Sequence, residues 1–128
     1  MSSQSKIIGA VVAFAAIVAI PVILLQRRAP LPDDKVSRLA LAAMTSDLRG
    51  LMLAQETTKR IRGRYVVDPE MAGHISSLGV TKPVISLSDS GWAATVSHQT
   101  IPELRCAVAV YNRNPLKRFA KSGEIVCE

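Results

Sequence analysis

The sequence predicts an α+β fold in which one long amphipathic helix covers a small antiparallel sheet. Between residues 35 and 62 apolar side chains recur at helical spacing, and beyond residue 80 the pattern changes to short runs with strand-like alternation. A helix stripe and one sheet face can bury each other, which is the simplest way to close such a domain. The length of 128 residues allows one ordinary domain and excludes a large enzyme with an insertion domain.

The helix predicted over residues 35–62 has recognisable signals at both ends. Asp33 or Asp34 can cap its start, and Gly63 is suited to cap its end in a left-handed conformation. The apolar stripe of this helix is formed by Leu41, Met44, Leu48, Leu51 and Met52. Such a stripe needs a surface to pack against, and the strands that follow supply it.

Four short strands are predicted from β-branched content and alternation, over residues 84–87, 92–97, 106–111 and 124–127. Turn chemistry separates them at residues 89–91, 100–102 and 112–123. The connection over residues 64–80 carries further turn signals and has room for one short helical turn. The strands therefore predict a three- or four-stranded antiparallel sheet.

The N-terminal segment predicts a membrane anchor. Residues 7–25 carry no charge, and as a helix they would span about 29 Å, close to the hydrocarbon thickness of a bilayer. We therefore expect a tail and transmembrane signal anchor over 1–25, a linker over 26–34 and a folded domain over 35–128; a cleavable secretory signal is the competing interpretation. Small residues and a proline mark the positions predicted to pack within the membrane: Gly9, Ala13, Ala16 and Pro21. A second run of comparable length is absent, which excludes a polytopic transporter.

Two observations disagree on the orientation of this anchor. More basic residues follow the apolar run than precede it, which favours a cytoplasmic C-terminal side. Cys106 and Cys127 are the two cysteines of the chain, and a disulfide between them would require an oxidising compartment such as the periplasm. Such a bridge would contribute about 3 kcal/mol by constraining the unfolded chain. Two free thiols in a cytosolic domain are the alternative.

Several local motifs occur together in one order. A long helix runs into the turn Gly63-Arg64-Tyr65, the strand-like stretch GWAATVSH covers residues 91–98, and Cys106 and Cys127 lie near the C-terminus. Over about residues 39–128 this order resembles type IV pilins and pseudopilins. The resemblance implies a pilin-like domain in the periplasm of a bacterium, anchored in the inner (cytoplasmic) membrane, with an oxidised cysteine pair. The chain departs from that family in lacking a recognisable prepilin leader and the glutamate at the fifth mature position, which favours a role outside the filament.

The sequence contains no pattern typical of a catalytic, metal or cofactor site. His74 and His98 are far apart with no acidic cluster near either, and no C-x-x-C or phosphate-binding loop occurs. We therefore expect a protein that is not an enzyme, has no cofactor and takes no small-molecule substrate. Nucleic-acid binding is not expected either, because only 4% of the residues are aromatic and stacking platforms are missing.

The chain has a net charge of +6, and its basic residues lie at both ends of the predicted helix and around the C-terminal loop. The candidate contact residues at the end of the predicted helix are Lys59, Arg60, Arg62 and Arg64, and those in the loop 112–123 are Arg113, Leu116, Lys117, Arg118, Phe119 and Lys121. Clusters of this kind suit anionic lipid head groups or acidic faces of partner proteins, although a solvated surface would look the same.

These features together predict a single-span structural subunit that docks onto and stabilises a larger membrane protein complex. One candidate host is a bacterial photosynthetic reaction-centre and light-harvesting assembly. The alternative is a minor pilin or pseudopilin of a type IV pilus or type II secretion filament. A third reading, which follows the count of basic residues, is an adaptor on the cytoplasmic membrane surface.

Overall fold

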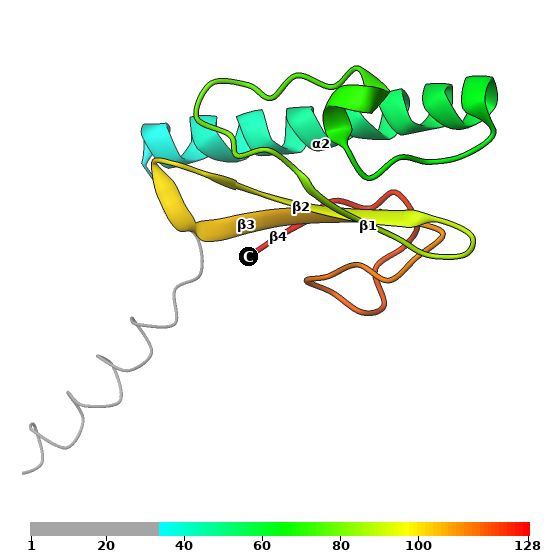
Figure 1. Cartoon of the computed structure of the whole chain (residues 1–128). Helices are drawn as coiled ribbons and strands as arrows, with labels where there is room; N and C mark the ends of the chain where they lie inside the picture. The colour runs from blue at the N-terminus through cyan, green and yellow to red at the C-terminus, as the bar shows by residue number, and fades with distance from the viewer. Residues whose placement is uncertain (1–33) are drawn as a thin grey trace, which may run out of the picture. The chain divides into compact units, whose positions relative to one another are not determined.

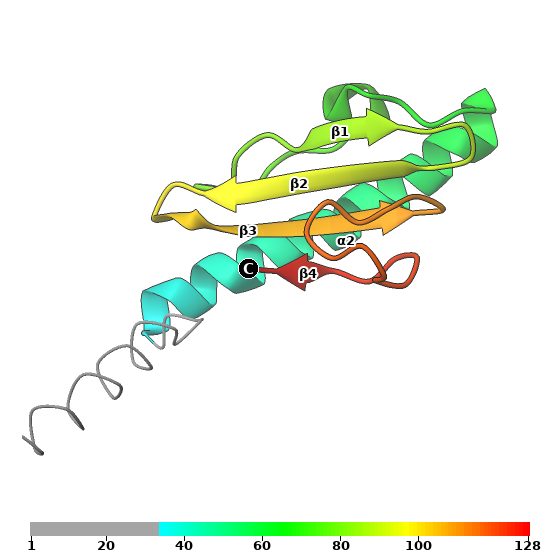
Figure 2. The same cartoon turned by 90° about the horizontal axis from the view of Figure 1, so that it is seen from below.

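The computed structural model describes residues 34–128, which form one long helix packed on a four-stranded antiparallel sheet (Figure 1). The predicted α+β fold is thereby confirmed. The elements are α2 (Lys35–Arg62), the short 3-10 helix η1 (Pro69–Ala72), β1 (Val84–Leu87), β2 (Trp92–His98), β3 (Ile101–Val110) and β4 (Val126–Cys127). The strands lie in the order β1-β2-β3-β4, so each pairs with its neighbour in the chain (Figure 2).

The predicted membrane anchor lies outside the described residues. This applies to the packing positions Gly9, Ala13, Ala16 and Pro21 and to the linker up to residue 33. Within residues 34–128, no helix combines the length and the apolar character that crossing a membrane requires.

Helix α2 has the two caps that the sequence predicts. The side chain of Asp34 accepts a hydrogen bond of 2.6 Å from the Ser37 N–H, and this bond is the main cause that lowers the pKa of the Asp34 carboxyl. At the other end Gly63 has φ 80°, and its N–H donates to the Lys59 carbonyl at 2.8 Å. A left-handed residue at this position favours glycine, which explains where the helix ends.

The core lies between α2 and the face of the sheet that α2 covers. Met44, Leu48 and Leu51 of the helix are fully buried there, as the predicted apolar stripe requires. From the sheet, alternate residues of β2 and β3 point into the same layer, with Trp92 and Val108 among the largest. Burying a large apolar side chain stabilises the fold by about 2 kcal/mol, so this layer is the main source of stability in the domain.

Strand β3 begins earlier than the sequence predicts. Its first residue is Ile101, whereas the pattern indicated a turn over residues 100–102 and a strand from Cys106. The register explains the difference, because Ser97 pairs with Arg105 while the next residue of β2 pairs with Ile101. Residues 102–104 therefore bulge out of the ladder. Pro102 is tolerated there because a residue in a bulge need not donate a hydrogen bond to the neighbouring strand, and proline has no N–H to donate. Strand β4 is also shorter than predicted, with two residues instead of four.

The turn between β1 and β2 is pressed against the end of β3. A Cβ atom on Gly91 would lie 1.9 Å from the Val110 carbonyl oxygen and 2.5 Å from that of Tyr111. Ser90 Oγ also donates to the Tyr111 carbonyl at 3.2 Å. Only glycine permits this approach, which joins the β1–β2 turn to the start of the loop after β3.

Candidate docking surfaces

The four basic residues predicted at the end of α2 lie together and are all exposed. We call Lys59, Arg60, Arg62 and Arg64 the helix-end cluster. In the described part of the chain no carboxylate forms an ion pair with any of them. Three of the four occupy the last turn of α2, where cations interact favourably with the helix dipole. The cluster therefore leaves its charge available to an external anionic surface.

Tyr65 lies next to this cluster and contacts both α2 and the core. Its hydroxyl donates to Glu56 Oε1 at 2.9 Å, its ring centroid lies 6.4 Å from that of Trp92, and Lys59 Nζ lies 4.9 Å from the ring centroid. Burial raises the pKa of Tyr65 to about 12, and the hydrogen bond to Glu56 acts in the same direction. The tyrosine thus stays protonated and keeps its hydrogen bond at any physiological pH.

The connection over residues 64–80 is held against α2 by two buried polar side chains. The amide of Gln55, which is fully buried, donates to the Val66 carbonyl at 2.7 Å and accepts from the Val66 N–H at 3.0 Å. The carboxylate of Asp47 accepts the Ser77 N–H at 2.7 Å and also the Ser77 hydroxyl. An open apolar groove of about 360 Å³ lies along the first part of this connection and is lined by Val67, Met71 and Leu87, among others.

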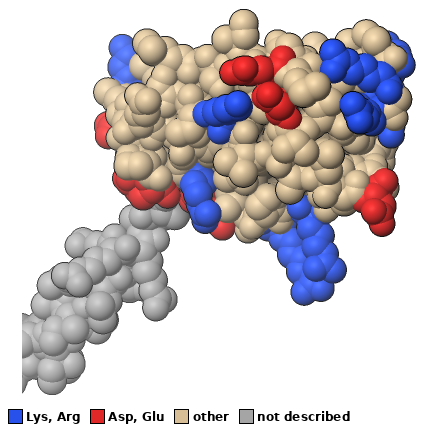
Figure 3. Space-filling view, in the orientation of Figure 1, with Lys and Arg blue, Asp and Glu red and all other residues tan. Residues whose placement is uncertain are grey.

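The loop 112–123 lies on the face of the sheet opposite α2, where both views show it crossing β3 (Figures 1 and 2). We call this segment the C-terminal loop. Its cations are all exposed, Leu116 is half-buried and Phe119 is 87% exposed. Figure 3 shows lysine and arginine side chains at the end of the domain where α2 ends, and others that project beneath the sheet. The structure therefore does not join the two predicted basic groups into one surface, because the sheet lies between them.

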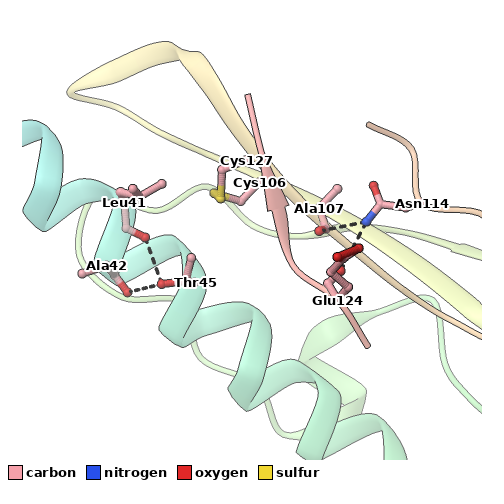
Figure 4. Close-up of a disulfide and its surroundings, with 8 residues drawn as sticks. All are labelled: Leu41, Ala42, Thr45, Cys106, Ala107, Asn114, Glu124 and Cys127. Atoms are coloured by element: carbon pink, nitrogen blue, oxygen red, sulfur yellow. Dashed lines mark hydrogen bonds between the residues drawn. A yellow bond between two sulfur atoms is a disulfide. The ribbon is translucent and has the colours of Figure 1, made fainter. Parts of the chain in front are cut away.

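The cysteine pair joins β3 to β4. Cys106 and Cys127 are directly opposite in the ladder, and their sulfur atoms are 2.09 Å apart, which is a disulfide (Figure 4). The pair is on the helix-facing side of the sheet, near Leu41, Ala42 and Thr45 of α2 (Figure 4). The disulfide implied by the resemblance to pilins is thus present, and it fixes the C-terminal strand to the core.

A surface that the sequence analysis missed runs along the outer side of α2. Leu39, Leu53 and Ile61 are 61%, 70% and 76% exposed, and a Cβ atom on Gly50 would meet nothing within 4 Å. These positions follow the helical period on the side away from the core. The signal in the sequence was the presence of large apolar residues off the main stripe of the helix.

The two histidines are in separate places. His98 Nδ1 accepts the Thr100 N–H at 3.0 Å in the β2–β3 turn, and His74 follows η1. Among residues 34–128 no three His, Cys, Asp or Glu side chains gather in a way that could hold a metal ion.

No protein-family model matches the chain, and no curated protein and no solved structure matches it either. The candidate surfaces therefore rest on the geometry described above.

Proposed function

We propose that the protein is a non-enzymatic, single-span membrane-anchored accessory subunit that docks onto a larger membrane protein complex. Its folded domain lies in the periplasm and its anchor in the inner membrane of a bacterium. A photosynthetic reaction-centre and light-harvesting assembly is one candidate host. The cysteine pair supports the periplasmic side, because a disulfide persists in an oxidising compartment.

The observation that carries the proposal is the uncovered outer side of α2. Single exposed apolar side chains are common, but Leu39, Leu53 and Ile61 share one side of a long, regular helix, and apolar groups gathered on one face are typical of an interaction site. Gly50 makes this side slim near its middle, so another helix can approach closely. The helix-end cluster adjoins the same side and favours a partner with an acidic face.

A photo-crosslinking residue at position 53 of the native full-length protein tests this proposal. Val84 is the matched control position, because its exposure of 74% is close to the 70% of Leu53 and it belongs to the sheet. We expect position 53 to crosslink to one other membrane subunit and position 84 not to do so. Mass spectrometry after mild-detergent purification identifies that subunit. Equal crosslinking from both positions, or none from position 53, would contradict the proposal.

A second candidate is a minor pilin or pseudopilin within a filament, and the outer side of α2 is compatible with it. N-terminal sequencing of the native protein separates the two. A chain that begins at Met1 or Ser2 excludes the filament, whereas a cut between residues 6 and 14 excludes the accessory subunit. Crosslinks from position 53 to other copies of the same chain would also favour the filament.

The cytoplasmic adaptor is separated from both by labelling intact cells with a membrane-impermeant thiol reagent. A periplasmic disulfide reacts in intact cells only after reduction. Labelling that appears only after lysis, without any reductant, would place the domain in the cytoplasm.

A further inference from the structure

The C-terminal loop is an ordered projection. Asn114 is buried, and its amide nitrogen donates to the Ala107 carbonyl at 3.2 Å and to the Glu124 carbonyl at 3.4 Å. Its side-chain oxygen accepts the N–H groups of Leu116 and Lys117 at 2.9 and 3.2 Å. One asparagine thus satisfies four hydrogen bonds, which hold the first half of the loop against the sheet.

The second half of the loop is fixed by its own turns. The Ala120 N–H donates to the Lys117 carbonyl at 3.1 Å, and the Lys121 N–H donates to Glu124 Oε2 at 3.2 Å. The N–H of Gly123 then returns to the Ala109 carbonyl of β3 at 2.8 Å. The tip between these bonds is therefore presented in a defined conformation.

The tip exposes an aromatic ring among cations. Phe119 is 87% exposed, and the guanidinium of Arg118 lies 5.5 Å from its ring centroid. Residues 113–121 contain Arg113, Lys117 and Lys121 besides Arg118, and they include no acidic residue. No carboxylate in the described part of the chain forms an ion pair with these four cations. A single exposed apolar side chain is common on protein surfaces, and Leu78 is exposed to a greater extent than Phe119. The loop tip is distinguished by the combination of an exposed ring with four cations and no acidic residue, which suits an anionic surface.

We propose that the C-terminal loop inserts Phe119 into the head-group layer of an anionic lipid bilayer, with its four cations against the lipid phosphates. A projecting ring needs a matched pocket in a protein partner, whereas a fluid head-group layer accommodates it without one. The surrounding positive charge is complementary to anionic lipids, and basic residues near such a surface each add to the attraction. The inference rests on the proposed membrane location of the protein, but the loop and the anchor make separable contributions.

The test places a tryptophan at the loop tip of the full-length chain. The variant Phe119→Trp is reconstituted into nanodiscs of phosphatidylcholine alone or of phosphatidylcholine mixed with phosphatidylglycerol. We expect its fluorescence to shift to the blue, and to be quenched by brominated acyl chains, only in the discs that contain phosphatidylglycerol. The matched control is Leu78→Trp, because Leu78 is 98% exposed in the 64–80 connection. The buried Trp92 contributes the same background to every variant.

Charge neutralisation provides the second measurement. Replacing Lys117 and Arg118 by glutamine in the Phe119→Trp background is expected to lower the ratio of inserted to free loop by about thirtyfold. Circular dichroism checks that the fold is intact, which is expected because all three side chains are exposed. Equal insertion into phosphatidylcholine alone, equal quenching of the Leu78→Trp control, or no effect of the charge change would each overturn the proposal.

Failure of the anchor and failure of the loop give different results. A chain that co-elutes with the discs while the tryptophan introduced at the loop tip stays unquenched retains the anchor and refutes the loop proposal. A chain that co-elutes only with phosphatidylglycerol discs, with quenching, supports the loop and refutes the anchor. No co-elution with either composition refutes both.

Discussion

The two long connections of the domain are ordered by different means. The 64–80 connection is held by side chains that reach it from α2, since Gln55 binds Val66 and Asp47 binds Ser77. The C-terminal loop is held from within, by Asn114 and by the turn that ends at Gly123. The first connection therefore depends on the helix, whereas the second depends on its own sequence and on the sheet beneath it.

This difference has a functional consequence. A segment anchored to the helix cannot change without disturbing the core, because its anchors are buried among core residues. A self-ordered loop can carry a contact surface that varies independently of the fold. Each of the following changes tests whether the two connections respond separately.

The largest effect is expected at the helix anchor of the 64–80 connection. Gln55→Ala leaves the Val66 N–H and carbonyl buried without partners, so we expect a loss of about 4 kcal/mol in the free energy of unfolding. Hydrogen exchange should accelerate in residues 64–80 while the C-terminal loop keeps its protection. Thr57→Ala is the control, because its hydroxyl binds only the Leu53 carbonyl of the same helix. Equal acceleration in both connections would show that they are not separate.

Removing the disulfide is expected to affect the C-terminal loop and β4 more than the 64–80 connection. The double substitution Cys106→Ala and Cys127→Ala opens a bridge between residues separated by 21 positions, and should cost about 3 kcal/mol. Denaturant unfolding measures the cost. The lower global stability should reduce the protection of all core amides, the Val66 N–H included, by one common factor. Beyond that factor, hydrogen exchange should accelerate in β4 and in the second half of the C-terminal loop. An acceleration at Val66 that exceeds the common factor as much as it does in β4 would contradict the independence of the two regions.

A smaller and more local effect is expected at Asn114. Asn114→Ala removes four hydrogen bonds, two of which satisfy carbonyls at the sheet and two of which fix the loop backbone. We expect a loss of about 2 kcal/mol, because the exposed loop groups can turn to water. The amides of Leu116 and Lys117 should lose protection, and the 64–80 connection should keep its own. A change confined to the 64–80 connection would overturn the assignment of Asn114 as the organiser of the loop.

Tyr65, at the start of the 64–80 connection, should make the free energy of unfolding depend on pH. The folded pKa of Tyr65 is raised to about 12, mainly by burial, while tyrosine in an unfolded chain titrates near 10. The native state therefore keeps a proton that the unfolded state releases, so this stability is fully present below pH 10 and is lost as the pH rises toward 12. Phenylalanine at position 65 should remove that part of the pH dependence. If the free energy of unfolding falls with pH at the same slope in wild type and in Tyr65→Phe between about pH 10 and 12, Tyr65 is not the titrating group.

The elements of the fold could be predicted from the sequence because they follow from local periodicity. Helix α2 and its caps at Asp34 and Gly63 depend only on residue types at fixed spacing. The predicted start of β3 was wrong because Pro102 is typical of a turn. Only the pairing register shows that Pro102 occupies a bulge within the strand. Register is a tertiary property that no window of the sequence contains.

The candidate surfaces were predictable in composition and not in arrangement. The residues of the helix-end cluster and of the C-terminal loop were found from their charge. Their separation by the sheet depends on how the chain crosses β3 and returns along β4. The contact between the Gln55 side chain and the Val66 backbone was not predicted. A glutamine on a helix is usually exposed, and the burial of Gln55 depends on the backbone that returns past it at Val66.

The smallest effect on stability is expected from a substitution on the outer side of α2. Gly50 is an exposed glycine within a regular helix, and an added methyl group would meet nothing within 4 Å. Gly50→Ala should therefore stabilise the domain by about 1 kcal/mol, because alanine has the higher helix propensity. Hydrogen exchange in both connections should slow slightly and equally, since neither contacts this side of the helix.

The same position separates stability from docking when a larger residue is used. The side chain of Gly50→Trp begins in open space at an exposed helix position. We therefore expect the free domain to unfold close to wild type, whereas a helix seated on this side would be displaced. We expect Gly50→Trp to abolish the crosslink from position 53 while Gly50→Ala weakens it far less. A Gly50→Trp variant that crosslinks as well as wild type would show that the outer side of α2 is solvated in the assembled protein, and the docking surface would then have to be sought at the helix-end cluster or the groove beside Leu87.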